Sequence, residues 1–211
     1  MASNLDLVRS KKNAVRRSLA AVLAADMVGY SRQMNDDAVR TLASLRRLRV
    51  ELFGPLVAGH HGKLANSMGD GWIVTFTSAV DAVTCAMRVQ DKLILEPEVE
   101  LRIGIHMGDV IRQGDEIFGD SINIAARLQE LCAPGGLVIS DAVFGGLDGT
   151  LRPAFDAGGD HDLKNIPLPV RIWTRGGLVG ASEARALKKR SGFPPNIRSC
   201  CPSDPPPAWR H

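Results

Sequence analysis

Long apolar runs are missing from this sequence of 211 residues. No stretch approaches the roughly 20 apolar residues that a membrane-spanning helix needs. The basic start, MASNLDLVRSKKNAVRRS, is not followed by the apolar segment of a secretory signal. We therefore expect a cytoplasmic protein. The length suits one domain with a sizeable core and some additional chain.

Cysteines and aromatic residues are also scarce. The four cysteines form no C-x-x-C pair and no spacing typical of metal ligands, which argues against a zinc site or a disulfide framework. Aromatic residues make up 5% of the chain. A ferredoxin-like RNA-binding domain stacks bases on exposed aromatic side chains of its sheet, so this composition disfavours such a domain.

Positive charge is missing from the central part of the chain. The net charge is +3, but residues 1–18 and residues 180–211 each carry +4, which leaves −5 on residues 19–179. A nucleic-acid-binding domain concentrates its basic side chains on the folded domain itself. We therefore expect no nucleic acid among the partners.

The composition divides the chain into three segments. Residues 1–18 are a basic N-terminal segment or linker, which could join the protein to a regulatory or sensor domain in a longer chain. Residues 19–175 carry the apolar patterns of a folded domain. Residues 176–211 are rich in Pro, Gly, Ser and basic residues and can bury little apolar surface, so we expect most of this tail to be disordered.

The first part of the folded segment reads as a strand followed by a helix. The apolar run Leu19–Ala25 predicts a buried strand. Asp36 or Asp37 can cap the next segment, in which leucines recur at helical spacing over residues 42–56. Pro55 is expected to kink or end that helix, because proline removes a backbone hydrogen bond.

The remaining patterns alternate between hairpins and helices. Two short strands are expected around a turn at residues 69–71. Ser78 followed by Asp81 predicts the start of a helix over residues 79–93. A strand pair turning at residues 113–115 comes next. A helix in SINIAARLQELC, a strand in GGLVIS and a hairpin over residues 154–174 complete the domain.

This order of elements predicts an α+β fold. It corresponds to a ferredoxin-like βαββαβ core with additional C-terminal strands. We expect a mostly antiparallel sheet with the helices on one face. In such a core the first strand is central and pairs with the third. That pairing would bring the end of the first strand close to the turn of the first hairpin.

Two carboxylates stand where predicted strands end. Asp26 follows the run Leu19–Ala25, and Asp70 lies between two glycines in the first hairpin turn. Each alone is also what an ordinary strand end or turn contains. Together they suit Mg²⁺, which takes one or two carboxylates and completes its coordination with water and phosphate oxygens.

Two further patterns favour phosphate binding. In DMVGYS, Gly29 allows the backbone to approach a ligand, Ser31 adds a hydroxyl, and successive backbone N–H groups can hold a triphosphate. In FGDSINIAARL, Asn123 and Arg127 are four residues apart and share one helix face. Arg offers a planar, permanently charged group suited to a phosphoryl oxygen. A solvent-facing Asn and Arg is the simpler alternative.

Five segments, in order, carry a resemblance to a known family: ADMVGYS, MGDGWIVTF, LRIGIHMGDVI, IFGDSINIAARL and LKNIPLPVRIW. On these residues the chain resembles the class III nucleotidyl cyclase catalytic domain of the adenylate/guanylate cyclase family. The resemblance spans roughly residues 19–175.

The resemblance implies a two-metal reaction. Asp26 and Asp70 would be the metal-binding carboxylates, with the backbone of Met27 as a further metal contact, and each active site would hold two Mg²⁺ or Mn²⁺ ions. One ion would lower the pKa of the ribose 3′-hydroxyl, and the other would bind the triphosphate and help pyrophosphate leave. From ATP the product would be 3′,5′-cyclic AMP.

The resemblance also implies the substrate contacts. Asn123 would orient the ribose, Arg127 would stabilise the charged transition state, and Lys164 in LKN would bind phosphate. The residues implied around the triphosphate after the first strand are Met27, Gly29, Tyr30 and Ser31.

A homodimer follows from the same resemblance. Family members use Asn and Arg from one protomer and both Asp residues from the other. One chain that carries all four implies a head-to-tail dimer with two equal composite sites.

Two positions depart from the family's patterns for reading the base. Asn66 stands where adenylate cyclases typically have Lys, and Glu116 stands where they have Asp or Thr, while guanylate cyclases favour Glu and Cys. Glu116 could accept a hydrogen bond from the adenine amino group. ATP is the expected substrate, with GTP or mixed specificity as the alternative. A catalytically inactive nucleotide-binding or dimerisation module is an alternative of another class.

Overall fold

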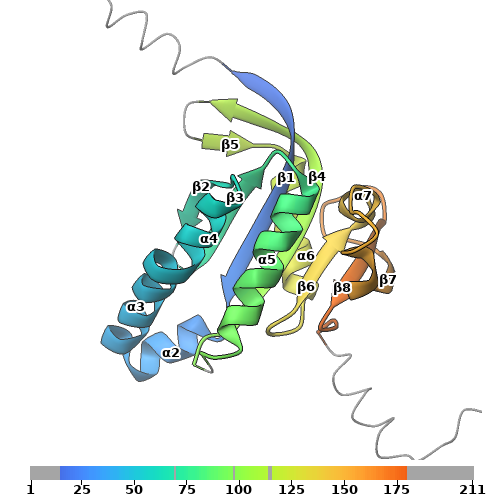
Figure 1. Cartoon of the computed structure of the whole chain (residues 1–211). Coiled ribbons are helices and arrows are strands. Elements are labelled where there is room, and N and C mark those ends of the chain that lie inside the picture. The colour runs from blue at the N-terminus through green and yellow to red at the C-terminus, as the bar shows by residue number, and fades with distance from the viewer. Residues whose placement is uncertain (1–14, 69, 97, 114–115, 180–211) are drawn as a thin grey trace, which may run out of the picture.

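The structure, a computed structural model, describes residues 15–179 except for residues 69, 97, 114 and 115. The predicted disorder of the tail concerns mainly residues 180–211, which lie outside the described residues. An eight-stranded sheet has the order β2-β3-β1-β4-β6-β8-β7, and β5 pairs with β4 beside this path (Figure 1). The strands are β1 (Arg16–Met27), β2 (Lys63–Met68), β3 (Gly71–Phe76), β4 (Leu101–Gln113), β5 (Glu116–Phe118), β6 (Leu137–Ser140), β7 (Asp156–His161) and β8 (Val170–Arg175).

The expected sheet is confirmed. β1 is central and pairs antiparallel with β3 and with β4, and β4 and β6 form the parallel pair. The described helices are α2 (Tyr30–Asp36), α3 (Ala38–Arg47), the π-helix η1 (Leu48–Phe53), α4 (Gly54–Gly59), α5 (Ala79–Leu93), α6 (Asp120–Leu131), α7 (Asp141–Gly145) and the 3₁₀-helix η2 (Arg152–Ala154).

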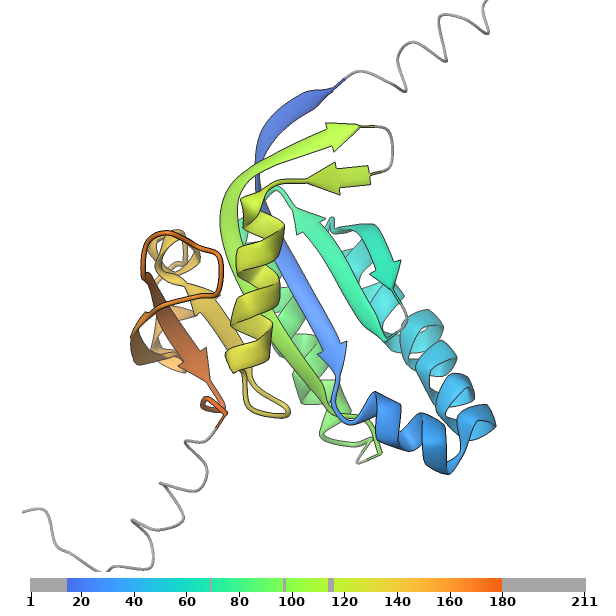
Figure 2. The same ribbon diagram turned by 180° about the vertical axis from the view of Figure 1, so that it is seen from behind.

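Helices cover both faces of the sheet, so the expectation of helices on one face is wrong for α6. Leu23 of β1 shares a buried cluster with Val83 of α5, whereas its neighbour Val22 shares another with Ala125 of α6. α5 lies in front of the sheet in Figure 1, and α6 lies in front of it in the reverse view of Figure 2. The βαββαβ core keeps its helices on one face, and α6 belongs to the addition that covers the other.

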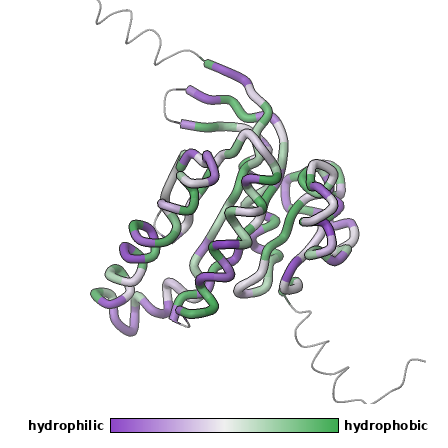
Figure 3. Tube along the Cα trace, viewed as in Figure 1, coloured by the Kyte–Doolittle hydropathy of each residue, from purple (hydrophilic) through white to green (hydrophobic). Residues whose placement is uncertain are grey.

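The uninterrupted apolar run of β1 is the physical reason for this arrangement. A strand with one solvent face alternates apolar and polar residues, whereas a strand covered on both faces is apolar throughout. Residues 20–25 are all buried. In Figure 3 the strands in the middle of the molecule are mainly green, while α3 alternates between purple and green. Among the described helices, none combines the length and the apolar character that a membrane span requires.

The expected break at Pro55 takes the form of a change in helix type. The helical segment does not end at Pro55. It widens into η1 just before this proline, and the Gly54 N–H bonds to the carbonyl of Arg49. Pro55 then lies in the first turn of α4, where its missing N–H costs least. The two predicted caps are confirmed in α3 and α5. The side chains of Asp37 and Ser78 accept hydrogen bonds from the backbone N–H groups three residues on.

α6 packs onto the sheet at a glycine. A Cβ atom on Gly104 of β4 would lie 2.4 Å from the carbonyl oxygen of Ala125 and 2.3 Å from the backbone nitrogen of Gln129. Both atoms belong to the helix backbone, which a side-chain rotation cannot move away. Gly104 therefore sets how closely α6 approaches β4.

The variant Gly104→Ala is expected to push α6 away from the sheet. We expect the free energy of unfolding to fall by roughly 1–3 kcal/mol, the usual cost of overpacking, measured by urea denaturation. Gly59→Ala is the control, because a Cβ there meets nothing within 4 Å. It should leave stability within about 0.5 kcal/mol of the wild type. Equal stability of the two variants would contradict the close packing.

His106 is a partly buried histidine on the same face of β4 as Gly104. Its Nδ1 lies 2.9 Å from the Ser140 Oγ, and burial lowers the pKa of the ring to about 4. The ring is therefore neutral in the folded protein at neutral pH.

This burial predicts an acid-dependent loss of stability. Between pH 6.5 and pH 4 the unfolded chain binds a proton at His106 and the folded chain does not. The contribution of the neutral ring to the free energy of unfolding is therefore present above pH 6.5 and is lost as the pH falls towards 4. The loss is on the order of 3 kcal/mol. Urea denaturation of the wild type and His106→Gln across this range should show a stability difference that narrows with acid. Parallel curves would contradict the prediction.

Candidate active site

Asp26 lies at the end of β1, between two neighbouring strands. Its Cα is paired with Gly71 of β3 and with Arg102 of β4. Gly71 follows Asp70 directly, so the register of β1 and β3 carries the two predicted carboxylates to the same end of the sheet. The structure thus brings together Asp26 and Asp70, which are 44 positions apart in the sequence.

The charge environment of Asp26 is mixed. Burial, followed by repulsion from the Asp70 carboxylate, raises the pKa of Asp26, and the Arg102 guanidinium opposes this shift. The Arg102 Nη2 lies 3.2 Å from the Asp26 Oδ2, and each of the two side chains is 29% exposed. The balance disfavours the ionised form of Asp26 in the protein alone, which is typical of a carboxylate placed for a function.

Arg102 is a site residue that the sequence analysis missed. It is a single charged residue in the apolar run LRIGI, directly opposite Asp26 in the strand register. Its Nε is buried, and no hydrogen-bond partner for it is found among the described residues. The available signal was a permanent charge inside an otherwise apolar run.

The turn after β1 has the conformation expected of a backbone that approaches a ligand. Met27 is buried, and Gly29 adopts a left-handed φ of 71°, which favours glycine. Tyr30 and Ser31 begin α2, and the Ser31 side chain is exposed. These residues therefore lie next to Asp26 along the chain, as the sequence indicated.

A second group of predicted residues belongs to α6. Asn123 is exposed and Arg127 is partly exposed on the helix that covers β4 and β1. The Arg127 Nη1 lies 2.5 Å from the Glu130 Oε1, one turn further along the helix. Glu130 is a contact that the sequence analysis did not single out.

Lys164 lies on the loop between β7 and β8, which packs against α6. The loop is anchored by Leu163 and Ile166, which join a buried cluster with Leu128 of α6. Lys164 itself is exposed. The anchoring therefore keeps the loop against the helix that carries Asn123.

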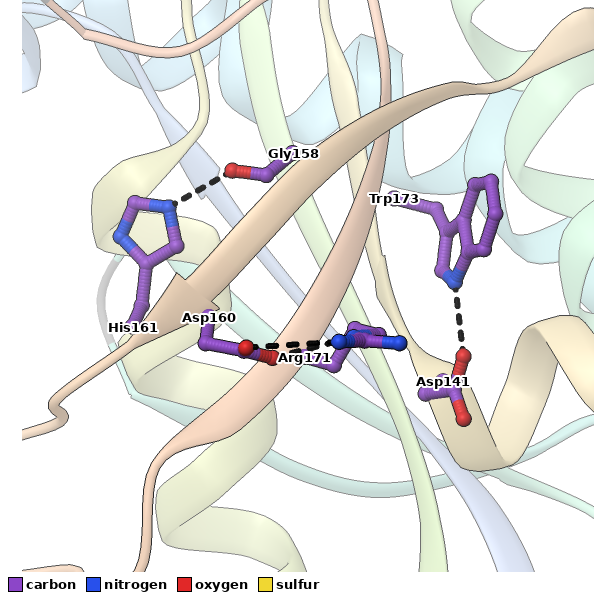
Figure 4. A network of polar contacts seen from close by, with 6 residues as sticks. All are labelled: Asp141, Gly158, Asp160, His161, Arg171 and Trp173. Atoms are coloured by element: carbon purple, nitrogen blue, oxygen red, sulfur yellow. Dashed lines mark hydrogen bonds and ion pairs between the residues drawn. The ribbon is translucent and has the colours of Figure 1, made fainter. Parts of the chain in front are cut away.

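Polar contacts brace the hairpin that carries this loop (Figure 4). The Arg171 Nε lies 3.1 Å from the Asp160 Oδ1 across the two strands. The Trp173 Nε1 donates to the Asp141 Oδ1 at 2.9 Å, which ties β8 to α7.

The two residues predicted to read the base lie on two strands that are in contact but do not pair. Glu116 is the exposed first residue of β5, and Asn66 lies in β2, directly after an irregularity in the pairing with β3. β2 and β5 are in contact. The side chain of Asn66 lies outside the described part of the structure.

The carboxylate pair fits Mg²⁺ or Mn²⁺ better than a resident zinc ion. Among the described residues, no group of three or more His, Cys, Asp or Glu side chains is arranged to hold a metal. Two carboxylates and a backbone carbonyl leave positions for water and phosphate oxygens, which is how Mg²⁺ is commonly bound. A nearby cation would also relieve the repulsion that raises the pKa of Asp26.

Comparisons with known proteins place this geometry in a family. No protein-family model matches the chain. The crystal structure of an adenylate/guanylate cyclase/hydrolase from Silicibacter pomeroyi is similar with a TM-score of 0.72 and 34% identity, over 77% of this chain and 98% of that chain. The adenylyl cyclase CyaB from P. aeruginosa shares the fold, with a TM-score of 0.66 and 18% identity over 76% of this chain and 95% of its own.

Curated sequences agree with the structural comparison. A Rhizobium meliloti (strain 1021) protein named "Putative adenylate cyclase 3" is 39% identical over 203 residues, which is 93% of this chain and 32% of that protein. The chain thus spans about a third of the length of this relative. The near-complete coverage of the Silicibacter pomeroyi structure at 34% identity decides the assignment. The chain belongs to the class III nucleotidyl cyclase family, the family of adenylate and guanylate cyclase catalytic domains.

Proposed function

We propose that the protein is a nucleotide cyclase that converts ATP to 3′,5′-cyclic AMP and pyrophosphate at a homodimer interface. The observation that carries the proposal is the meeting of Asp26, Asp70 and Arg102 at one end of the sheet. Family membership supports the proposal, since two carboxylates and a guanidinium suit a metal-bound triphosphate.

In this proposal the carboxylates bind two divalent cations, Mg²⁺ or Mn²⁺. Asp26 and Asp70 provide the side-chain ligands, and the backbone carbonyl of Met27 provides a further oxygen. When bound, the cations would acidify the ribose 3′-hydroxyl and neutralise the leaving pyrophosphate. The raised pKa of Asp26 supports this role, because a buried carboxylate next to another one gains from a neighbouring cation.

Arg102 and the turn after β1 bind the triphosphate. The Arg102 guanidinium lies beside Asp26 and has a buried Nε with no partner among the described residues, so an incoming phosphate oxygen could satisfy it. Gly29, Tyr30 and Ser31 contribute backbone N–H groups and a hydroxyl at the start of α2.

The α6 group acts on the ribose and on the reacting phosphoryl group. Asn123 orients the ribose, so that its 3′-hydroxyl lies in line with the α-phosphate. Arg127 stabilises the charge that develops in the transition state, and its loss would mainly lower kcat. Lys164 binds phosphate from the adjacent loop.

The two groups are proposed to meet across a dimer. A head-to-tail homodimer with two-fold symmetry brings the carboxylates of one protomer to α6 of the other and creates two equal sites. The contact of Arg127 with its own helix neighbour Glu130 supports this view, because within the described chain this guanidinium is not engaged with Asp26 or Asp70.

The choice of base is proposed from Glu116 and Asn66. An ionised Glu116 accepts hydrogen bonds and so favours the amino group of adenine, and Asn66 can both donate and accept. ATP is therefore the proposed substrate, with GTP as the alternative. A regulatory or sensor domain in a longer protein remains part of the proposal.

Mixing two inactive variants tests the composite site. Asp26→Asn and Arg127→Ala should each form no cyclic product. A 1:1 mixture that exchanges subunits should recover about a quarter of the wild-type activity, because half of the dimers are mixed and each mixed dimer has one intact site. The measurement is chromatography with mass detection of products from ATP and from GTP, with Mg²⁺ or Mn²⁺.

A matched mixture serves as the control. Asp26→Asn with Asp70→Asn should stay inactive, because both changes damage the same group and no mixed dimer contains an intact site. Recovery in this control, or no recovery in the first mixture, would overturn the composite site. If the metal-loaded wild-type dimer forms no cyclic product from either nucleotide, the protein is instead a non-catalytic binding or dimerisation module.

A further inference from the structure

Arg102 forms an ion pair with Asp26, one of the two carboxylates proposed to bind the metal ions. The two residues are paired across the central strands β1 and β4, and the guanidinium Nη2 lies 3.2 Å from the carboxylate Oδ2. Because both backbones belong to the sheet ladder, the pairing is built into the strand register. It does not depend on a flexible loop.

The guanidinium is only partly satisfied by this ion pair. Its Nη2 bonds to Asp26, while its Nε is buried without a partner among the described residues. A buried donor without an acceptor costs folding free energy. An arginine placed only to stabilise the fold would be expected to use this donor. Movement of the guanidinium towards an anion would give the Nε an acceptor.

The charges of the cluster give Arg102 two opposite effects. Asp26 and Asp70 attract a divalent cation, and Arg102 repels it and competes for the same carboxylate oxygen. A triphosphate reverses the balance, because it offers the guanidinium new anionic acceptors and brings its own negative charge to the cations.

We propose that Arg102 controls the order of loading, keeping divalent cations weakly bound at Asp26 until the triphosphate draws the guanidinium away. Metal and nucleotide then enter the site together. This inference rests on the proposed function, since it takes Asp26 and Asp70 as the metal-binding carboxylates. It makes Arg102 a residue that weakens free-metal binding and strengthens nucleotide binding.

Mn²⁺ binding to the nucleotide-free, metal-stripped full chain tests the proposal. In a titration followed by electron paramagnetic resonance, Arg102→Gln should bind Mn²⁺ on the order of tenfold more tightly than the wild type, because a nearby positive charge is removed. Arg102→Lys keeps the charge and should remain weak. The KM for ATP should rise on the order of tenfold in Arg102→Gln, because a charged contact to phosphate is lost.

Tighter Mn²⁺ binding combined with a higher KM for ATP separates this role of Arg102 from a purely structural one. A variant that merely loosens the fold would weaken both metal and nucleotide binding. Arg47→Gln is the matched control, since it removes an arginine from an ion pair with Glu96 that involves none of the proposed site residues. It should change neither the affinity for Mn²⁺ nor the KM for ATP. If circular dichroism shows that Arg102→Gln is unfolded, Arg102→Met, which retains most of the aliphatic stem, replaces it in the same titration.

The outcomes distinguish this inference from the proposed function. Unchanged or weaker Mn²⁺ binding in the folded Arg102 variant overturns the loading role. Asp26→Asn should lose Mn²⁺ binding in the same experiment. If Asp26→Asn binds Mn²⁺ like the wild type, the metal site of the proposed function fails. If only the Arg102 variant behaves like the wild type, the metal site stands and the loading role fails.

Discussion

Burial of β1 on both of its faces is the constraint on which the other elements depend. The strand pairs with β3 and β4 and is covered by α5 on one side and by α6 on the other. Because β1 is held on both faces and both edges, the position of its C-terminal end relative to β3 and β4 is fixed. Asp26 therefore meets Arg102 through strand register, which is more rigid than a loop. It meets Asp70 in the turn that leads directly into β3.

The site that results is electrostatically unfavourable for the protein alone. Burial and the Asp70 carboxylate raise the pKa of Asp26, and Arg102 offsets this only in part. Its own Nε remains without a partner in the described part of the chain. Charged residues whose positions lower the stability of the ligand-free protein are typical of functional sites, where a ligand supplies the missing interactions.

The second group of residues depends on a different contact. α6 lies close to β4 because Gly104 has no side chain, and the same helix anchors the loop of Lys164 through Leu128. Its outer face carries Asn123 and Arg127. The family membership and the division into two groups together favour a site shared between protomers, which is the basis of the proposed dimer.

The sequence by itself predicted the local elements, and its resemblance to the family implied the type of chemistry. Apolar periodicity, caps and turn residues predicted the strands, the helices and the positions of Asp26 and Asp70 at strand ends, because these signals act between near neighbours. Only the tertiary structure decided which face α6 covers and that Arg102 lies opposite Asp26. The first depends on the packing of α6 against β1 and β4. The second depends on strand register between residues 76 positions apart, which no local pattern specifies.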